Sequence, residues 1–575
     1  MWGVNPGVLG SEPMEYDLKI RGGTLVDGTG AVPRRGDVGI RGGAIVALGD
    51  APGTASTTID AGGLAVAPGF VDLHTHYDAQ ILWDPLLAIS PWHGVTTVVM
   101  GNCGFGVAPT RAEHRDLVLR TLEKVEGMSL ACLQAGCGDA WLFETFPQYL
   151  DVIERRGSAI NVTALLGHTP LRLYVMGEAA TERAATDDEI AHMRRLVREA
   201  VDAGAIGFAT SKSPTHVGYR GKPVPSRAAD LREIQALAGV LGEAGRGVIQ
   251  ATVGAGFFID ELAALSRETG RTVTWTALLA GLLGPGSHRA FLEWSERVLR
   301  SGARVIPQVA CRPLNFEFDL AEPFPFESVP AFQPISAADH AGKCRLYADP
   351  TFRAAVRAAL EGGRGGPLQV CWDRIVVTHV PGDPAMAERP LVEVARARDQ
   401  DPLDCMFDLG LASDLAARFR FAIMNFDEDE VAELLTHPDT VLGLSDAGAH
   451  AGQLCDACFS THLLGHWVRE RGTLSLEQAV RMLTSRPAEV MGITDRGRLA
   501  PGLAADVVVF DPASVGASAL RRVHDLPAAA ERLVADAYGI EAVVVNGTVI
   551  RRAGKDQPAR TGTLPGRLLR GGRAA

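Results

Sequence analysis

The two ends of the chain share a short alternating pattern of apolar and polar residues. Near the start, YDLKIRGGTLVDG and GDVGIRGGAIVALG alternate with a period of two and are interrupted by Gly-Gly and Asp-Gly pairs. This pattern is typical of strands joined by tight turns. The same pattern returns near the other end, in GRLAPGLAADVVVFD and IEAVVVNGTVI. We therefore expect residues 14–68 and 497–550 to form one small β-sandwich domain built from both chain ends.

The long middle segment alternates short apolar runs with helical patterns. The runs are rich in β-branched residues, as in TTVVMGN, AINVTALLGH, AIGFATS and TVLGLSD. Between them lie amphipathic stretches such as DDEIAHMRRLVREAVDAG, whose apolar residues have helical spacing. Such alternation favours parallel strands with crossover helices. About eight of these units predict an α/β fold, a (β/α)8 TIM-like barrel over residues 69–496, with its chemistry at the strand C-terminal ends.

Three segments depart from this rhythm. A stretch rich in Pro, Phe and acidic residues, at about residues 313–367, predicts an insertion over the mouth of the barrel. Residues 1–13 precede the patterned sequence and are interpreted as a disordered or vector-like tail. Residues 551–575 are interpreted as a C-terminal arm, which either contacts a second subunit in a homo-oligomer or wraps its own domain.

Composition narrows the class of protein without defining it. The chain is 46% hydrophobic and 22% charged, which is ordinary for a globular protein. Its net charge of -12 argues against nucleic acid or an anionic membrane as a partner. No run reaches the roughly 18 apolar residues of a membrane span, and the N-terminus lacks the pattern of a secretory signal. Nine scattered cysteines favour free thiols in a reducing compartment, so we expect a cytoplasmic protein.

The sharpest local motif is GFVDLHTHYD, residues 69–78. An apolar strand there delivers His74 and His76 two positions apart, and side chains at this spacing point to the same face of a strand. Two imidazoles on one face are a ready pair of ligands for a first-row metal ion. The motif therefore predicts a metal site at the end of the first barrel strand. The alternative is a pair of ordinary polar residues at a strand end.

Four further motifs extend this picture, namely HTHYDAQ, HGVTTVVMGNCGFGVAP, GLSDAGAH and DRGRLAPGLAADVVVFDP. Together with the split β domain, they resemble the amidohydrolase superfamily and, more narrowly, an atypical subgroup of its N-acyl-D-amino-acid deacylase (D-aminoacylase) branch. The resemblance covers residues 16–511. It implies a metal-dependent hydrolase that cleaves a non-peptide C–N bond of a small-molecule amide, with zinc as the cofactor.

The resemblance also implies roles for two further residues. Asp446, in VLGLSDAGAH, matches the aspartate that serves as general base and acid and often touches the metal. Such a carboxylate accepts a proton from water and returns it to the leaving nitrogen; the alternative is an Asp that caps the following helix. Cys103, in VVMGNCGFG, matches a zinc ligand, and its alternative is a small buried thiol.

The sequence departs from this branch on two strands. The branch carries a histidine on each of the fifth and sixth barrel strands, whereas GVIQATVG and TVTWTALLAG place Gln250 and the Trp275-Thr276 pair there. We therefore expect a reduced centre that holds one zinc ion rather than two. The candidates for a replacement ligand are His216, His168, His379 and a carbamylated Lys212.

Polar residues near the expected strand ends are candidates for binding the substrate. These candidates are Arg220, Arg312, His379, Gln250 and His450, and arginine in particular suits a carboxylate. The leading hypothesis is an N-acyl-D-amino-acid deacylase. One alternative is a one-metal enzyme that opens a cyclic amide or hydrolyses another small amide or ester. A second alternative is a barrel that binds a ligand without turnover.

Overall fold

The centre of the molecule is a barrel of parallel strands. The computed structural model describes residues 15–326, 329–361, 371–557 and 562–574, so the expected tail at 1–13 lies outside the described residues. Eight strands form one sheet in the order β17-β12-β11-β10-β9-β8-β7-β6. They are β6 (Phe70–Asp72), β7 (Val95–Met100), β8 (Asn161–Gly167), β9 (Gly207–Ser211), β10 (Val248–Thr252), β11 (Val273–Thr276), β12 (Val305–Val309) and β17 (Val441–Leu442).

The sheet closes between its first and last strands. Thr75, after β6, bridges Ala447, after β17, and the His76 N–H donates to the Ala447 carbonyl at 2.8 Å. All residues of β7 and β8 are buried, as expected for parallel strands covered on both faces. The predicted (β/α)8 barrel is therefore confirmed, and its closure lies directly at the histidine motif.

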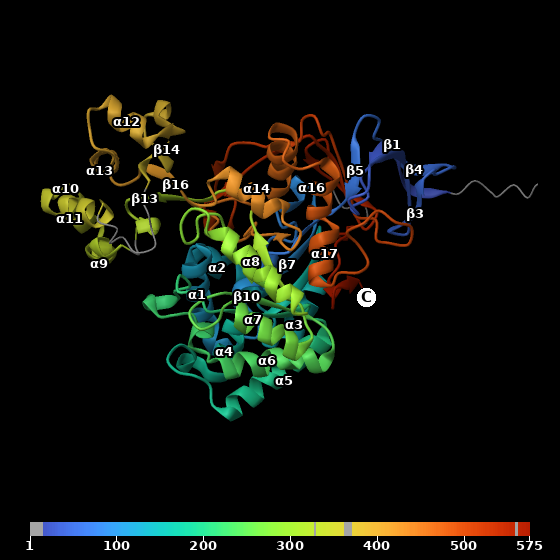
Figure 1. Cartoon of the computed structure of the whole chain (residues 1–575), viewed down its shortest axis with the longest axis horizontal. Coiled ribbons are helices and arrows are strands. Elements are labelled where there is room, and N and C mark those ends of the chain that lie inside the picture. The colour runs from blue at the N-terminus through green and yellow to red at the C-terminus, as the bar shows by residue number, and fades with distance from the viewer. Residues whose placement is uncertain (1–14, 327–328, 362–370, 558–561, 575) are drawn as a thin grey trace, which may run out of the picture.

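Helices surround this sheet (Figure 1). The α5 helix shows how the sequence sets their limits: Thr186 and Glu189 form a capping box at its start, and Gly204, with φ 110°, ends it. The helices of the barrel are α1 (Arg115–Glu126), α2 (Leu130–Cys137), α3 (Phe146–Arg156), α4 (His168–Met176), α5 (Asp187–Ala203), α6 (Leu231–Ala244), α7 (Ile259–Thr269), α8 (Ser287–Arg300), α14 (Glu428–Thr436), α15 (Phe459–His462), α16 (Leu476–Leu483) and α17 (Ser485–Met491). None of the helices in the described part of the chain is long and apolar enough to cross a membrane.

A separate β domain is assembled from both ends of the chain. Its sheet has the order β25-β24-β23-β18-β5-β1-β2-β3, with β4 paired to β1. The strands are β1 (Tyr16–Leu25), β2 (Arg34–Arg41), β3 (Ala44–Gly49), β4 (Ala55–Asp60), β5 (Ala65–Pro68), β18 (Val507–Phe510), β23 (Ile540–Val545), β24 (Thr548–Arg552) and β25 (Lys555–Asp556). The β18–β5 pairing joins the two ends. In Figure 1 the N-terminal strands of this domain lie at the upper right, beside the barrel.

The insertion between β12 and β17 is larger than the predicted 313–367. It has its own sheet, β13-β16-β14-β15, with β13 at Leu314–Asp319, β14 at Ile375–His379, β15 at Arg389–Pro390 and β16 at Arg418–Met424. Its helices are α9 (Gln333–Ala337), α10 (His340–Ala348), α11 (Pro350–Glu361), α12 (Leu391–Ala397) and α13 (Pro402–Ala412). A hydrophobic core that runs from Phe318 to Phe421 holds it together. The sequence underestimated its extent because β14, with the run IVVTH, has the apolar pattern of a barrel strand. In Figure 1 the insertion lies at the left, apart from the barrel helices.

The C-terminal segment packs on its own barrel. Residues 551–556 comprise the end of β24, a turn and β25. In the described part of the segment beyond them, Leu568 forms a parallel bridge with Val162 of β8. Arg570 also contacts Asp151 and Glu154 of α3, each at 2.8 Å. The described part of the arm therefore lies against the barrel of its own chain.

Candidate metal centre

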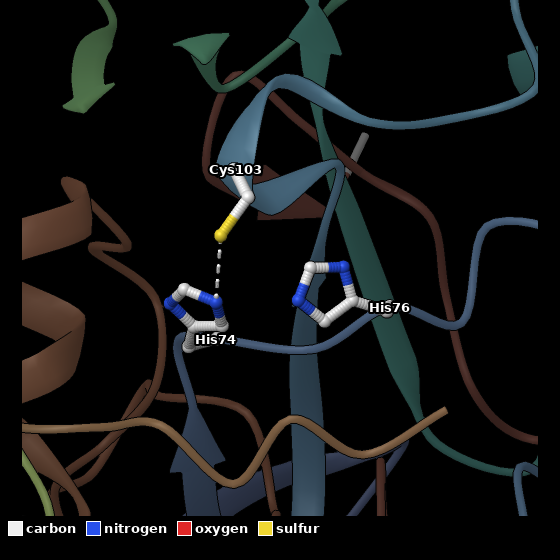
Figure 2. A group of neighbouring side chains, drawn as sticks. All are labelled: His74, His76 and Cys103. Carbon is white, nitrogen blue, oxygen red and sulfur yellow. Dashed lines mark hydrogen bonds between the residues drawn. The ribbon is translucent and has the colours of Figure 1, made fainter. Parts of the chain in front are cut away.

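Three side chains converge at the C-terminal end of the first two barrel strands. His74 and His76 follow β6, and Cys103 lies in the short 3-10 turn Asn102–Gly104 after β7. Their ligand atoms all lie within 4.8 Å of one another, and all three residues are buried. Figure 2 shows the two imidazoles and the thiol pointing toward one another, with Cys103 Sγ 3.4 Å from His74 Nε2.

Local glycines make the cysteine turn possible. Cys103 itself has φ 56°, in the left-handed region, and Gly101 and Gly104 on either side have φ 81° and 73°. A Cβ at Gly101 would lie 2.2 Å from the Leu165 carbonyl oxygen, so a larger residue does not fit there. The Cys103 N–H donates to Gln250 Oε1 at 2.7 Å. The turn is therefore tightly fixed, and it aims the thiol at the histidines.

Asp446 completes the group from the other side of the barrel closure. It follows β17 with φ 45°, and its Oδ1 lies 3.2 Å from His74 Nε2 and 3.5 Å from His76 Nε2. Ser445 holds the adjoining backbone, because its hydroxyl donates to the His74 carbonyl at 3.1 Å. One carboxylate oxygen thus faces both imidazoles, which places Asp446 where a proton acceptor or a further ligand is needed.

Two residues that the sequence analysis missed orient the imidazoles. Gln308 on β12 places its Oε1 2.7 Å from His74 Nδ1, and Glu126 at the end of α1 places its Oε1 3.1 Å from His76 Nδ1. Each oxygen favours the tautomer with the proton on Nδ1, which leaves Nε2 free to ligate. The inward position of Gln308 on its strand is a usable signal in the sequence. Glu126 carries no local signal, because it reaches the site only through packing.

The electrostatics of the centre favour ionised ligands. Burial would raise the pKa of the Cys103 thiol, but the neighbouring His74 imidazole outweighs it and lowers that pKa to about 6. Burial opposes charge on Asp446 too, yet His76 and His74 hold the pKa of this carboxyl well below its usual range. By contrast, burial raises the pKa of Asp72, which accepts the His74 N–H, to about 7.

The donor set fits a metal ion. Two imidazoles and a thiolate are borderline-to-soft ligands that suit zinc-class ions rather than magnesium or calcium. The pKa of the Cys103 thiol is lowered, and the Nε2 atoms of both histidines already face inward. His74, His76 and Cys103 would hold the ion, with Asp446 beside it.

The fifth and sixth strands carry no imidazole, as the sequence indicates. Gln250 on β10 is fully buried and donates from Nε2 to Thr276 Oγ1 at 3.4 Å. On β11 the two candidate positions separate: Thr276 faces this amide, whereas Trp275 points away and packs against Phe258 of the helical layer. Gln250 therefore supports the Cys103 turn.

The proposed replacement ligands lie elsewhere. His168 begins α4 and contacts Glu233 at 2.8 Å and Thr210 at 2.8 Å, in a fully buried group with Arg172. Lys212 donates from Nζ to two backbone carbonyls, at 2.5 and 2.7 Å, which a carbamate could not do. These hydrogen bonds give His168 and Lys212 structural roles outside the metal centre.

His216 lies closer to the centre but outside the three-ligand group. Its Nδ1 is 2.7 Å from Ser211 Oγ, and its ring packs on Phe105, whose ring also lies beside that of His76. Burial, aided by the charge on His76, lowers the pKa of His216 to about 3, so this imidazole is neutral. It forms part of the wall of the site.

The candidate substrate-binding residues lie at different distances from the metal centre. His450 lies close to Asp446, and its ring meets Phe316 of the insertion edge-on. Arg312 donates to Asp456 at 2.7 Å and lines a cavity of about 200 Å³ together with Arg420. Arg220 is exposed on a loop, over the ring of Tyr219.

The position of His379 contradicts the prediction that it is a ligand or a substrate-binding residue of the barrel. It ends β14 of the insertion and is exposed, so it follows no barrel strand. The apolar run RIVVTH resembles a barrel strand because the insertion buries one side of β14 in its own core. His379 therefore lies outside the centre.

A (β/α)8 barrel that closes at a His-x-His pair, with a thiol and an aspartate around it, defines a metal-dependent hydrolase of the barrel type. A family model described as "Amidohydrolase family" matches residues 57–314 and 368–551. The chain therefore belongs to the amidohydrolase family.

The most similar relatives include a D-aminoacylase and an N-acyl-D-glutamate deacylase, both from Alcaligenes xylosoxydans xylosoxydans. The first is 31% identical over 97% of this chain and 98% of its own length. The second is 32% identical over 97% of each. A solved structure of N-acyl-D-glutamate deacylase from Bordetella bronchiseptica, complexed with zinc and a phosphonate inhibitor, matches with a TM-score of 0.66 and 30% identity. It covers 97% of this chain and all of that one, which places the chain in the N-acyl-D-amino-acid deacylase branch.

Proposed function

We propose that this protein hydrolyses the amide bond of an N-acyl-D-amino acid and releases a carboxylate and the free amino acid. The observation that supports this proposal most directly is the convergence of His74, His76 and Cys103 beside Asp446. The relatives that the chain resembles along nearly its whole length bear the names of deacylases of this substrate class.

We further propose that the centre works with one zinc ion. The three clustered donors suffice for one ion, and the strands that carry histidines elsewhere in the branch present Gln250 and Thr276. For D-aminoacylase, a structural study describes one-metal activation and second-metal attenuation at its binuclear centre. A one-ion centre is thus compatible with turnover in this branch.

The roles of the protein groups follow from their positions. A zinc ion bound here supplies Lewis acidity, which polarises an amide carbonyl and makes water more acidic. His74 and His76 present Nε2, because Gln308 and Glu126 hold the other ring nitrogens. Asp446, ionised and next to both Nε2 atoms, accepts the proton of the attacking water and returns it to the departing nitrogen.

The test is a substrate panel on the zinc-loaded protein. It compares N-acetyl-D-amino acids with acidic and apolar side chains, their L-enantiomers, and cyclic amides. We expect turnover of the D-series with little or none of the L-series. Preferential opening of the cyclic amides would instead establish the ring-opening alternative.

Metal analysis on the same sample separates both enzymes from a barrel without turnover. We expect about one equivalent of zinc per chain at the barrel centre and loss of activity on chelation. A protein that lacks stoichiometric metal and turns over none of the panel would refute the proposal.

A further inference from the structure

A second group of metal-ligating side chains lies in the insertion. His340 and Cys344 are four positions apart on α10, so they share one face of that helix. Asp414 follows α13, which packs against α10. A ring nitrogen, a sulfur and a carboxylate oxygen from these three residues lie within 4.8 Å of one another. Figure 1 places α10 and α13 at the left edge of the molecule, away from the barrel.

The turn that carries Asp414 is held firmly. Asp414 has φ 53°, a left-handed conformation that aspartate tolerates better than most residues. The next residue, Leu415, is 1% exposed and its N–H donates to the Gly410 carbonyl at 2.7 Å. Ser413 on the other side accepts the Ala417 N–H at 2.8 Å. The carboxylate is therefore presented to α10 by anchored backbone.

The donors are already assembled. His340 Nε2 lies 2.8 Å from an Asp414 oxygen. In a tetrahedral zinc site, with bonds of about 2.0–2.3 Å, neighbouring ligand atoms lie roughly 3.3–3.8 Å apart. Small side-chain rotations would take the three atoms to that spacing. The neighbouring Lys343 does not compete for the anionic ligands, because its Nζ donates to the Ala321 carbonyl at 2.5 Å.

Charge and exposure suit a divalent ion that enters from solvent. The His340 and Asp414 side chains are 53% and 85% exposed, and Cys344 is half-buried. A thiolate and a carboxylate balance a 2+ charge, and the neutral imidazole completes three ligands. On binding, the thiol proton passes to water and the His340 proton moves to Nδ1. The fourth position faces solvent.

We propose that His340, Cys344 and Asp414 form a second zinc-class metal site, which ties α10 to the turn after α13. The mixed nitrogen, sulfur and oxygen donors favour zinc, cobalt or nickel over magnesium and calcium. The site is independent of the barrel centre and of the proposed deacylase activity.

The first test is protection of Cys344 from alkylation. The full-length protein is treated with iodoacetamide with and without zinc, and labelling is read by mass spectrometry. The peptide containing Cys371, the other partly exposed cysteine among the described residues, serves as the internal reference. We expect zinc to protect Cys344 and to leave Cys371 unchanged.

The ligand variants make this test specific. His340→Gln and Asp414→Asn each lose the protection, whereas His379→Gln and Asp399→Asn, on exposed residues of the insertion outside the group, keep it. If zinc leaves Cys344 labelling unchanged in the wild type, the site does not exist. If Asp414→Asn retains full protection, the helix pair binds zinc adventitiously and the three-ligand site is wrong.

A second test uses cobalt absorbance in a variant that lacks the thiol of the barrel centre. Cobalt added to Cys103→Ser protein is expected to give a thiolate-to-cobalt charge-transfer band that is lost on adding Cys344→Ser. A band that survives Cys344→Ser overturns the assignment. Because the readouts are labelling and absorbance, failure here leaves the substrate panel unaffected, and the reverse also holds.

Discussion

The two sides of the barrel mouth differ in the chemistry that they present. The side built from the first, second and last strands carries the ionisable groups, namely His74, His76, Cys103 and Asp446. The facing side, from the fifth to the seventh strands, carries amides and hydroxyls: Gln250, Thr276, Gln308 and Thr274. Apart from Asp446, whose side chain is 24% exposed, the residues of both sides are buried, so burial alone does not separate the two sides.

The hydrogen bonds show that the facing side holds the first side in place, and the proposed function assigns the chemistry to that first side. Gln308 fixes the ring of His74 and Gln250 fixes the turn of Cys103. Gln250 accepts the Cys103 N–H, so this amide supports one of the three candidate ligands. Variants on each side should therefore fail in different ways.

The largest expected effect is on the acting side, from Asp446→Asn. An amide cannot take the proton of the attacking water, so turnover should fall by roughly 100- to 10,000-fold. Zinc content and thermal stability should stay close to those of the wild type, because the three clustered donors remain. Steady-state kinetics together with metal analysis measure both. Normal turnover at normal zinc content would exclude Asp446 as the base.

On the supporting side, Gln308→Leu should weaken the metal rather than the chemical step. Removing the oxygen that holds His74 Nδ1 frees the ring to rotate and to change tautomer. Loss of such an outer contact weakens metal binding about 10- to 100-fold. Competition against a chromogenic chelator measures this affinity, and Gln308→Glu, which keeps an acceptor oxygen, is the matched control. Turnover at saturating zinc should recover toward the wild-type rate; if it does not, Gln308 has a role beyond orientation.

A further test adds metal ligands to the facing side of the barrel mouth. The double variant Gln250→His and Thr276→His places imidazoles at two inward positions near Cys103. In a Cys344→Ser background, which removes the site proposed in the insertion, we expect zinc stoichiometry to rise from one toward two ions per chain, measured by mass spectrometry of the metal. A matched control is Gln250→His with Trp275→His, because Trp275 faces the helices. An unchanged stoichiometry in the first double variant would show that the facing side cannot host an ion.

Much of the fold could be predicted because its signals are local. The strand runs, the glycine-rich turns and the two matched chain ends all lie in short windows of sequence. The extent of the insertion could not be predicted, because β14 buries one face in a second core and its run IVVTH has the apolar pattern of a barrel strand. Only tertiary packing distinguishes the two settings.

The site divides in the same way. His74 and His76 could be found from their spacing after an apolar strand, whereas Cys103 and Asp446 could be found through the resemblance of their motifs to a known family. Glu126 reaches His76 from the end of a helix, and His168 sits at a strand end yet turns away from the centre to Glu233. Those side-chain directions depend on which buried charge each residue meets, which no spacing rule contains.

The smallest expected effect on the centre comes from His168→Gln. The buried Glu233 carboxyl is opposed by burial but stabilised by His168 and Arg172, so its pKa lies at about 2, below the ordinary 4.5. A lowered pKa means that the charged form stabilises the fold above about pH 4.5 and that this contribution fades as the pH falls toward 2. Losing His168 should lower the free energy of unfolding by about 1–3 kcal/mol at neutral pH and should move acid unfolding to higher pH.

Chemical denaturation across this pH range measures the change in the free energy of unfolding. Zinc content and turnover per folded molecule should match the wild type, and a variant that loses its zinc while still folded would instead make His168 a ligand.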